Sequence, residues 1–194
     1  MPPISFRRGL GRFFGRPLRN CALILSVLMA AAAQARATGT AQTPIRGEDV
    51  NGHPVALNGK GHYTLVMYTN PDLEDDSRKM TLALDPYRSR SDFTLIRVVD
   101  LRGDVPPEMR TIVRVQIRQE EAKESARLKK AGVDGGNQAP IIADFSGSTL
   151  NALGWDSVYD RVHLVVYDTH GHEIKRLESV TDAKQMTKVI DGIL

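Results

Sequence analysis

Short apolar runs alternate with amphipathic segments from residue 49 to the end of the chain. Compact runs rich in strand formers occur at 64–69, 93–99, 141–144 and 162–167, a pattern typical of buried strands. After the first run, Asn70-Pro71 supplies a helix cap and a first helical residue, and Leu73, Met80 and Leu84 recur at helical spacing. We therefore predict a helix from Pro71 to about Asp85 that joins two parallel strands in a right-handed βαβ unit.

A second, longer helix is predicted to begin at Pro106-Pro107. Its first half has an apolar side formed by Met109, Ile112, Val113 and Ile117, whereas the segment beyond Gln119 is almost wholly charged. Because apolar faces pack and charged faces stay solvated, we expect the first half to pack on the sheet and the second half to extend over solvent.

Turn residues predict two hairpins and two further helices. Asn51-Gly52 lies between short apolar flanks, which favours a tight hairpin within residues 49–57. Residues 168–171 turn the 162–167 run into a partner strand at 173–176. A short helix is expected from Ser148 to Leu153, and a last helix follows a cap at Thr181, with Met186, Val189, Ile190 and Ile193 on its inner face. The prediction is one α/β domain over residues 49–194.

The first 37 residues have the three parts of a secretory signal peptide. A basic stretch runs to Arg19, an apolar stretch of 13 residues runs from Cys21 to Ala33, and Ala35-Arg36-Ala37 has the small-x-small pattern of a cleavage site. The apolar stretch is shorter than the ~20 residues of a bilayer-spanning helix. We expect residues 1–37 to be cleaved, residues 38–48 to be a flexible tether, and no stable membrane span to remain. Arg7-Arg8 leaves twin-arginine and general export both open.

The positive net charge of +3 belongs to this leader. Six arginines are the only charged residues up to Ala37, and the 20 basic residues that remain are outnumbered by 23 acidic ones. A folded part with this balance gives no reason to expect nucleic acid as a partner. The interpretation is an exported protein, periplasmic or secreted.

Cysteine usage restricts the chemistry further. The one cysteine, Cys21, lies inside the predicted leader, so the remaining 157 residues hold no disulfide and no thiol. Oxidising compartments favour disulfides, but a chain of this length can fold by core packing alone.

The order of predicted elements resembles the thioredoxin-like superfamily, in its redoxin and peroxiredoxin-like branch. Three stretches carry the resemblance: Gly59-Lys60 with 64–69 and an immediate helix, 142–144 with Gly147 and 153–155, and 161–168 with Gly171 and Ile174. The chain is also similar to the YtfJ family of periplasmic proteins. The resemblance implies a three-layer sandwich, with a mixed central sheet flanked by helices and an N-terminal β-hairpin.

At the strand-to-helix junction, where that superfamily keeps its cysteines, this chain has a carboxylate-rich turn. We regard this degenerate active-site region as the candidate site: Asn70, Pro71, Asp72, Glu74, Asp75, Asp76 and, by the resemblance to peroxiredoxins, Arg161. Carboxylates cannot undergo thiol-disulfide exchange. No catalytic residue and no cofactor are predicted.

Four other patterns leave sharper readings open. Asp72, Asp75 and Asp76 share a helix face that could hold a divalent cation, although a first turn favoured by the helix dipole is the simpler interpretation. His170 and His172 beside Asp168 are either metal ligands or turn residues. Arg110, Arg114 and Arg118 form a basic ridge that could receive an anion or remain solvated. Trp155 is expected to pack rather than to stack on a ligand.

The functional hypothesis is an exported thioredoxin-fold protein without thiol redox activity, serving as a binding or accessory protein of the cell envelope. Its partner is an unknown protein or small-molecule ligand. The alternative is a divalent-metal-dependent or otherwise diverged redoxin-like enzyme that uses the acidic helix start at Asp72 to Asp76.

Overall fold

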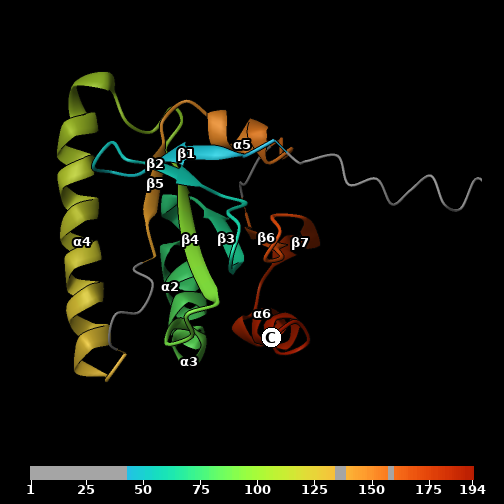
Figure 1. The fold of residues 1–194 in the computed structure, drawn as a ribbon. Helices are drawn as coiled ribbons and strands as arrows, with labels where there is room; N and C mark the ends of the chain where they lie inside the picture. Colours follow the sequence, from blue (N-terminus) through green and yellow to red (C-terminus); the bar gives the residue numbers. More distant parts are fainter. Residues whose placement is uncertain (1–42, 134–138, 157–159) are drawn as a thin grey trace, which may run out of the picture. The chain divides into compact units, whose positions relative to one another are not determined.

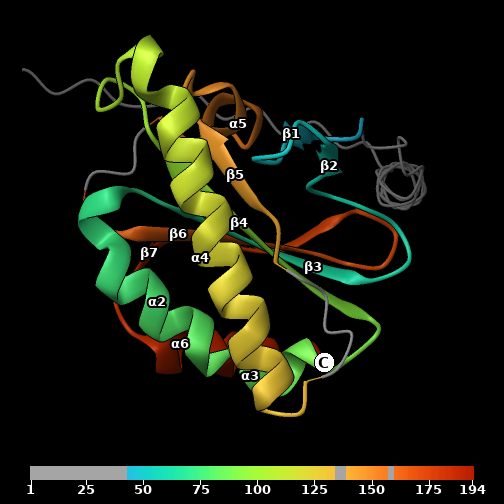
Figure 2. The same ribbon diagram turned by 90° about the vertical axis from the view of Figure 1, so that its left-hand side faces the viewer.

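The structure is a computed structural model, and it describes residues 43–133, 139–156 and 160–194. The predicted signal peptide lies outside these residues. Five strands form one mixed sheet in the order β5-β4-β3-β6-β7 (Figures 1 and 2). They are β3 (Tyr63–Thr69), β4 (Phe93–Asp100), β5 (Ile141–Asp144), β6 (Val162–Tyr167) and β7 (Glu173–Val180). β3, β4 and β5 are parallel, while β6 runs antiparallel to β3, and β7 to β6.

The predicted N-terminal hairpin is present. β1 (Arg46–Glu48) pairs antiparallel with β2 (Pro54–Ala56), and the turn between them is held by the Asp49 carboxylate, which accepts hydrogen bonds from the backbone N–H of Asn51 and His53, both at 2.8 Å. β1 starts before residue 49, so the prediction that the tether extends to residue 48 is wrong for residues 46–48. Residues 46–48 form a strand because they pair with β2, and this pairing cannot be recognised from the local sequence.

Seven helical segments are described. Two are 3-10 turns, η1 (Pro71–Leu73) before α2 and η2 (Pro107–Met109) before α4. The α-helices are α2 (Glu74–Ala83), α3 (Asp85–Arg88), α4 (Arg110–Lys130), α5 (Ser148–Ala152) and α6 (Ala183–Asp191). The helix predicted from Pro71 to Asp85 is thus η1 followed by α2, and Pro86 belongs to the separate α3. The cap of α6 is Asp182, whose carboxylate accepts from the Lys184 N–H, and not the predicted Thr181.

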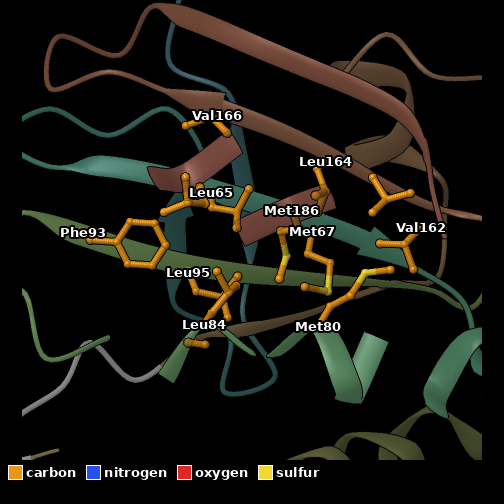
Figure 3. Packing of buried hydrophobic residues seen from close by; sticks show 13 residues of the cluster. Leu65, Met67, Met80, Leu84, Phe93, Leu95, Val162, Leu164, Val166 and Met186 are labelled. Atoms are coloured by element: carbon orange, nitrogen blue, oxygen red, sulfur yellow. The ribbon is translucent and has the colours of Figure 1, made fainter. Parts of the chain in front are cut away.

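Alternate residues of the sheet feed two hydrophobic clusters. On one face, residues of β3, β4 and β6 pack against α2 and α6 (Figure 3), with Leu65, Met67, Leu95, Leu164, Met80 and Met186 at the centre. On the other face, Val66, Tyr68, Val98 and Val165 pack against Leu150, Leu153 and Trp155, which belong to α5 and the segment after it. The sheet therefore lies between two layers, as the resemblance implied.

The two halves of α4 pack in the opposite way to the prediction, which had the first half on the sheet and the second half over solvent. Met109 and Ile112, from the apolar first half, are exposed, Ile112 by 50%. The charged second half is the anchored one: Leu128 is buried, the Glu121 carboxylate accepts the Ile141 N–H at 2.8 Å, and Arg127 forms an ion pair with Asp85. The prediction was wrong because those partners lie on other elements, which a local pattern of charge does not reveal.

In the described part of the chain, no helix is long and apolar enough to cross a bilayer.

Candidate functional site

The strand-to-helix junction is formed by the end of β3 and by η1. Asn70 has extended backbone and caps η1, its side-chain oxygen accepting the Leu73 N–H at 3.1 Å. Pro71 follows as the first helical residue, with no N–H to satisfy. The local fold predicted from Asn70-Pro71 is therefore confirmed.

The carboxylates of this turn point into solvent. Asp72, Glu74, Asp75 and Asp76 are all exposed. Asp75 forms an ion pair with Arg78 at 2.8 Å and Asp76 with Lys79 at 3.1 Å, each along the same helix. Exposed pairs of this kind contribute little to stability, so the acidic turn is a solvated start of α2.

Arg161 precedes β6 at the same edge of the sheet. Because His163 pairs with Tyr68 in the antiparallel register, Arg161 lies beside the end of β3. Its guanidinium contacts the Ser179 hydroxyl at 3.2 Å and the Asp160 carboxylate at 3.6 Å. Arg161 is thus an exposed residue that is paired with the neighbouring Asp160.

Among the described residues, no group of three or more His, Cys, Asp or Glu side chains is arranged to hold a metal ion. His170 and His172 stack with ring centroids 6.0 Å apart at the tip of the β6–β7 hairpin. The Asp168 carboxylate between them accepts the backbone N–H of both residues, at 2.8 and 2.9 Å. That carboxylate fixes the turn, in agreement with the simpler reading of the pattern.

A groove of about 460 Å³ begins at the junction and runs between α2 and α4. Thr69, Asn70 and Pro71 line one end of it. Figure 2 shows α2 and α4 on the same side of the sheet, with β4 behind them. The apolar residues of the groove are Leu82, Val99, Leu101, Val113, Ile117 and Ile141.

The groove combines an apolar lining with charged residues. Leu82 is 44% exposed there, although it is a large apolar side chain. Glu74 and Arg78 belong to the α2 side, and Lys123 to the α4 side. Sites that bind ligands or peptide segments have this composition, with apolar area for affinity and a few polar groups for orientation.

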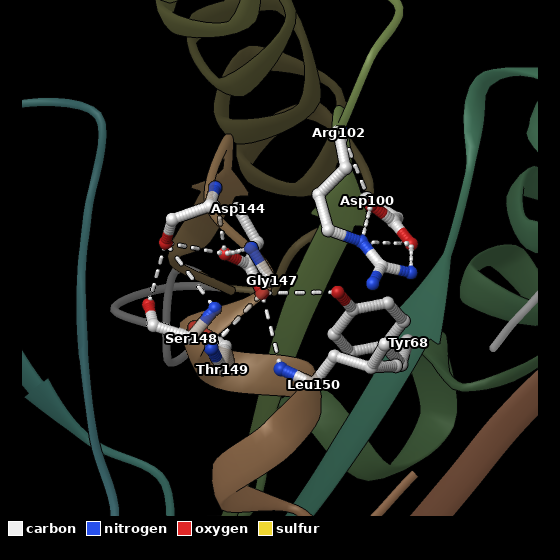
Figure 4. A network of polar contacts seen from close by, with 9 residues as sticks. Tyr68, Asp100, Arg102, Asp144, Gly147, Ser148, Thr149 and Leu150 are labelled. Carbon is white, nitrogen blue, oxygen red and sulfur yellow. Dashed lines mark hydrogen bonds and ion pairs between the residues drawn. The ribbon is translucent and has the colours of Figure 1, made fainter. Parts of the chain in front are cut away.

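A second polar cluster lies at the carboxyl ends of the parallel strands (Figure 4). Asp144, at the end of β5, is only 3% exposed. Its carboxylate accepts the Tyr68 hydroxyl at 3.0 Å and the backbone N–H groups of Gly147, Thr149 and Leu150 at 2.8 to 3.0 Å. These bonds fix the loop after β5 and the start of α5.

Asp100 and Arg102 lie next to this cluster. The Arg102 guanidinium donates to both Asp100 oxygens, at 2.7 Å for its shortest bond, which raises the pKa of Arg102. Burial, with the charge of Asp144 as a further cause, raises the pKa of Tyr68 far above its usual range. The Tyr68 phenol therefore stays protonated and donates to Asp144.

Sequence reasoning did not place Tyr68, Asp100, Arg102 or Asp144 in a site. One signal was available: Asp100 and Asp144 each end a buried strand, and the two strands are parallel. The carboxyl ends of parallel strands meet at one edge of a sheet, which is where polar sites form in α/β folds.

The comparison with known proteins agrees with this architecture. No protein-family model and no curated protein sequence matches the chain. Solved structures do. The thioredoxin-like protein from Aeropyrum pernix matches with a TM-score of 0.52 at 10% identity, covering 88% of this chain and 99% of that chain.

Two further matches come from bacteria. The DsbF homologue from Corynebacterium diphtheriae has a TM-score of 0.50 at 17% identity and covers 77% of this chain and 84% of that chain. StoA from Bacillus subtilis has a TM-score of 0.50 at 11% identity and covers 75% and 95%. The chain thus has the thioredoxin-like fold. At these identities the likeness defines the fold, and function has to be argued from the site.

Proposed function

We propose that this chain is an exported binding or accessory protein of the cell envelope that uses the thioredoxin-like fold without thiol redox activity. One observation carries the proposal: the groove between α2 and α4 opens at a strand-to-helix junction made of Thr69, Asn70 and Pro71. The junction offers a binding surface and no nucleophilic sulfur.

The absence of thiol chemistry follows from the residue types. Thiol-disulfide exchange needs a thiolate that attacks a disulfide and is later released. The chain has one cysteine, Cys21, within the segment that we propose to be a cleaved signal peptide, residues 1–37. Neither the Asn70 amide nor the neighbouring carboxylates can act as the thiolate nucleophile.

The groove supports binding because it presents apolar surface that the fold leaves uncovered. Leu82 lines it from α2, and Val113 and Ile117 line it from α4. Burial of uncovered apolar area by another molecule is favourable, because it releases water from that surface. The ligand class that we propose is an apolar small molecule or protein segment with polar ends, matched to the charged residues beside it.

We propose on the same motifs that the chain belongs to the redoxin-like branch and that it is similar to the YtfJ family. The supporting features are the order of elements, the short α5 before β6, and the β6–β7 hairpin with Gly171 at its turn. Cleavage after Ala37 and export complete the proposal.

The redox part is tested by expressing the whole chain with its own leader, isolating the exported form, sequencing its N-terminus and assaying reduction of insulin disulfides. We expect a start at Thr38 and no reduction above buffer. Turnover of insulin by a preparation that starts at Thr38 would contradict the proposal.

The binding part is tested with a photo-crosslinking amino acid placed at Leu82 in the native envelope. Ile174 on β7 is the matched control, because it is 43% exposed against 44% for Leu82 and does not line the groove. We expect a discrete adduct from position 82 that is lost when Val113 is replaced by Asp. Equal adducts from both positions, or an adduct insensitive to Val113→Asp, would contradict a groove-specific partner.

A further inference from the structure

The N-terminal half of α4 also borders a second cavity, of about 440 Å³, which is separate from the groove. Its cationic and hydroxyl-bearing residues come from β1, α4 and the loop that leads into α5. They are Arg46, Arg110, Arg114, Ser146 and Ser148, and the ring of Phe145 lies among them.

Two guanidinium groups share the Phe145 ring. The Arg110 guanidinium lies 5.2 Å from the ring centroid and that of Arg114 lies 5.5 Å from it. The residues are one helical turn apart, so their like charges repel. An aromatic face attracts each cation but does not neutralise either charge.

Neither arginine is neutralised by a carboxylate within residues 43–133, 139–156 and 160–194: the ion pairs found there involve other arginines. The same holds for Arg46. In addition, the Nε of Arg110 is buried and has no hydrogen-bond partner among the described residues. A buried donor without an acceptor is destabilising, so the Arg110 side chain is incompletely satisfied in the unliganded chain.

The acidic residues that border the cavity are mostly engaged elsewhere. Asp144 accepts from Tyr68 and from three backbone N–H groups of its own loop and α5. Asp49 accepts from the backbone of Asn51 and His53. Glu48 is the remaining carboxylate, on exposed β1. Three guanidinium groups and three carboxylates thus border the cavity, and Glu48 is the one carboxylate among them without a hydrogen bond from the described residues.

Hydroxyl groups supply further donors on the side opposite α4. The Ser146 hydroxyl lies 2.9 Å from the Ser148 hydroxyl and 3.3 Å from the Asp144 carboxylate. Ser148 is exposed, so its hydroxyl can turn to donate to a bound anion. The cavity thus has donors from two elements, α4 and the loop after β5. A tetrahedral dianion has acceptor oxygens in several directions, whereas a carboxylate has two in one plane with a single charge.

We propose that this cavity binds a phosphate group, free or as the head of a phosphate monoester, with Arg110 and Arg114 as its principal ligands. The bound dianion accepts from the guanidinium groups of Arg110 and Arg114, which have no carboxylate partner of their own, and receives a hydrogen bond from Ser148. Phe145 gives an ester with an aromatic or apolar body a surface to pack on.

The test is a titration of the exported form of the chain with inorganic phosphate and, separately, with phenyl phosphate. Binding is measured by calorimetry and by the NMR signals of the Phe145 ring, at a constant ionic strength set with chloride. We expect saturable binding of inorganic phosphate that shifts the ring signals. Tighter binding of phenyl phosphate would identify a monoester as the natural form, and equal binding would identify the free ion. In Arg110→Gln and Arg114→Gln the dissociation constant should rise about tenfold or more, the loss of one charge-assisted bidentate contact.

Arg118→Gln is the matched control: it removes the same charge from the same helix one turn further on, outside the cavity. It should change the dissociation constant less than about twofold, the size of a screened surface effect. The proposal is overturned if phosphate produces no shift beyond that of chloride, if acetate binds as well as phosphate, or if all three variants weaken binding alike. Because the cavity and the groove share no lining residue, either result leaves the groove test unchanged.

Discussion

Arg88 of α3 and Glu124 of α4 form an ion pair that joins two helices 36 residues apart in sequence, and the Arg88 side chain is only 1% exposed. Arg127 contacts the same Glu124 carboxylate at 2.9 Å and also reaches Asp85. The charged half of α4 is attached to the rest of the domain by this network of four residues. The position of α4, and with it one wall of the groove, depends on these charges.

Glu124→Gln should therefore destabilise the protein strongly. The hydrogen bond from Arg127, supported by that from Arg88, holds the pKa of Glu124 at about 2, below the ~4.3 of a free Glu side chain. A depressed carboxyl pKa adds stability that is fully present above the unfolded pKa and is lost as pH falls toward the folded pKa. We expect a loss on the order of 2–4 kcal/mol at pH 7, and a smaller difference from wild type at about pH 3. Urea unfolding at both pH values measures it.

Glu120→Gln is the control, since Glu120 pairs with Lys123 on the same helix but is exposed. It should cost less than about 0.5 kcal/mol. Equal losses in the two variants, or a Glu124→Gln deficit that persists undiminished in acid, would show that the network does not anchor α4.

The same network explains why sequence predicted α4 as a helix but misplaced its packing. Capping and spacing are local, so Asn70-Pro71, Leu73 and Met80 were enough to predict the first helix and its buried side. Glu124 has no local signal for burial, because its partner Arg88 comes from another element. A run of charges was read as solvated when it was in fact partly neutralised.

For the candidate site, too, only the part that depends on local sequence could be predicted. The junction at Asn70 and Pro71 was predicted from cap chemistry and from the resemblance, and the structure places it there. The groove could not be predicted, since it depends on how far α4 stands from α2. The cluster around Asp144 needed the parallel register of β4 and β5, which no single strand pattern contains.

Tyr68→Phe tests how much of that cluster depends on the side chain across the sheet. It removes one hydrogen bond to Asp144 and leaves those from Gly147, Thr149 and Leu150, with the longer ones from Ser146. We expect a loss of about 1 kcal/mol, measured by urea unfolding, with α5 intact.

Asp144→Asn is the stronger variant of the same cluster. Its amide nitrogen faces backbone donors on whichever side it takes, so at least one buried N–H loses its acceptor, and about 3 kcal/mol should be lost. Hydrogen exchange at Thr149 and Leu150 should speed up in Asp144→Asn and not in Tyr68→Phe. If both variants cost the same, the backbone bonds of Asp144 do not hold the loop.

The contact between His163 and Trp155 should make the fluorescence of Trp155 depend on pH. Their ring centroids lie 5.2 Å apart, and Trp155 is the one tryptophan of the chain. Burial lowers the pKa of His163 below its usual value, so the unfolded state binds the proton more readily than the folded state. Stability should therefore fall as pH drops below the ordinary histidine pKa of ~6.5.

Trp155 fluorescence should report this protonation, because an imidazolium beside the indole quenches its emission. We expect a transition with a midpoint below pH ~6.5 in the folded protein, and none in His163→Gln. A midpoint at or above that of a free histidine, or an unchanged transition in the variant, would contradict the assignment to a buried, neutral His163.

Gly171 holds the β6–β7 hairpin against the segment after β2. Its φ is +84°, and a Cβ built there lies 2.6 Å from the carbonyl oxygen of Asn58, a buried residue. Gly171→Ala combines left-handed strain of about 1–2 kcal/mol with a clash against backbone that cannot rotate away. Gly103→Ala separates the two causes, because Gly103 has a φ of +77° and no atom within 4 Å of such a Cβ. Urea unfolding should show Gly103→Ala losing about 1 kcal/mol and Gly171→Ala at least twice that, and identical losses would mean that the hairpin moves away from Asn58 at little cost.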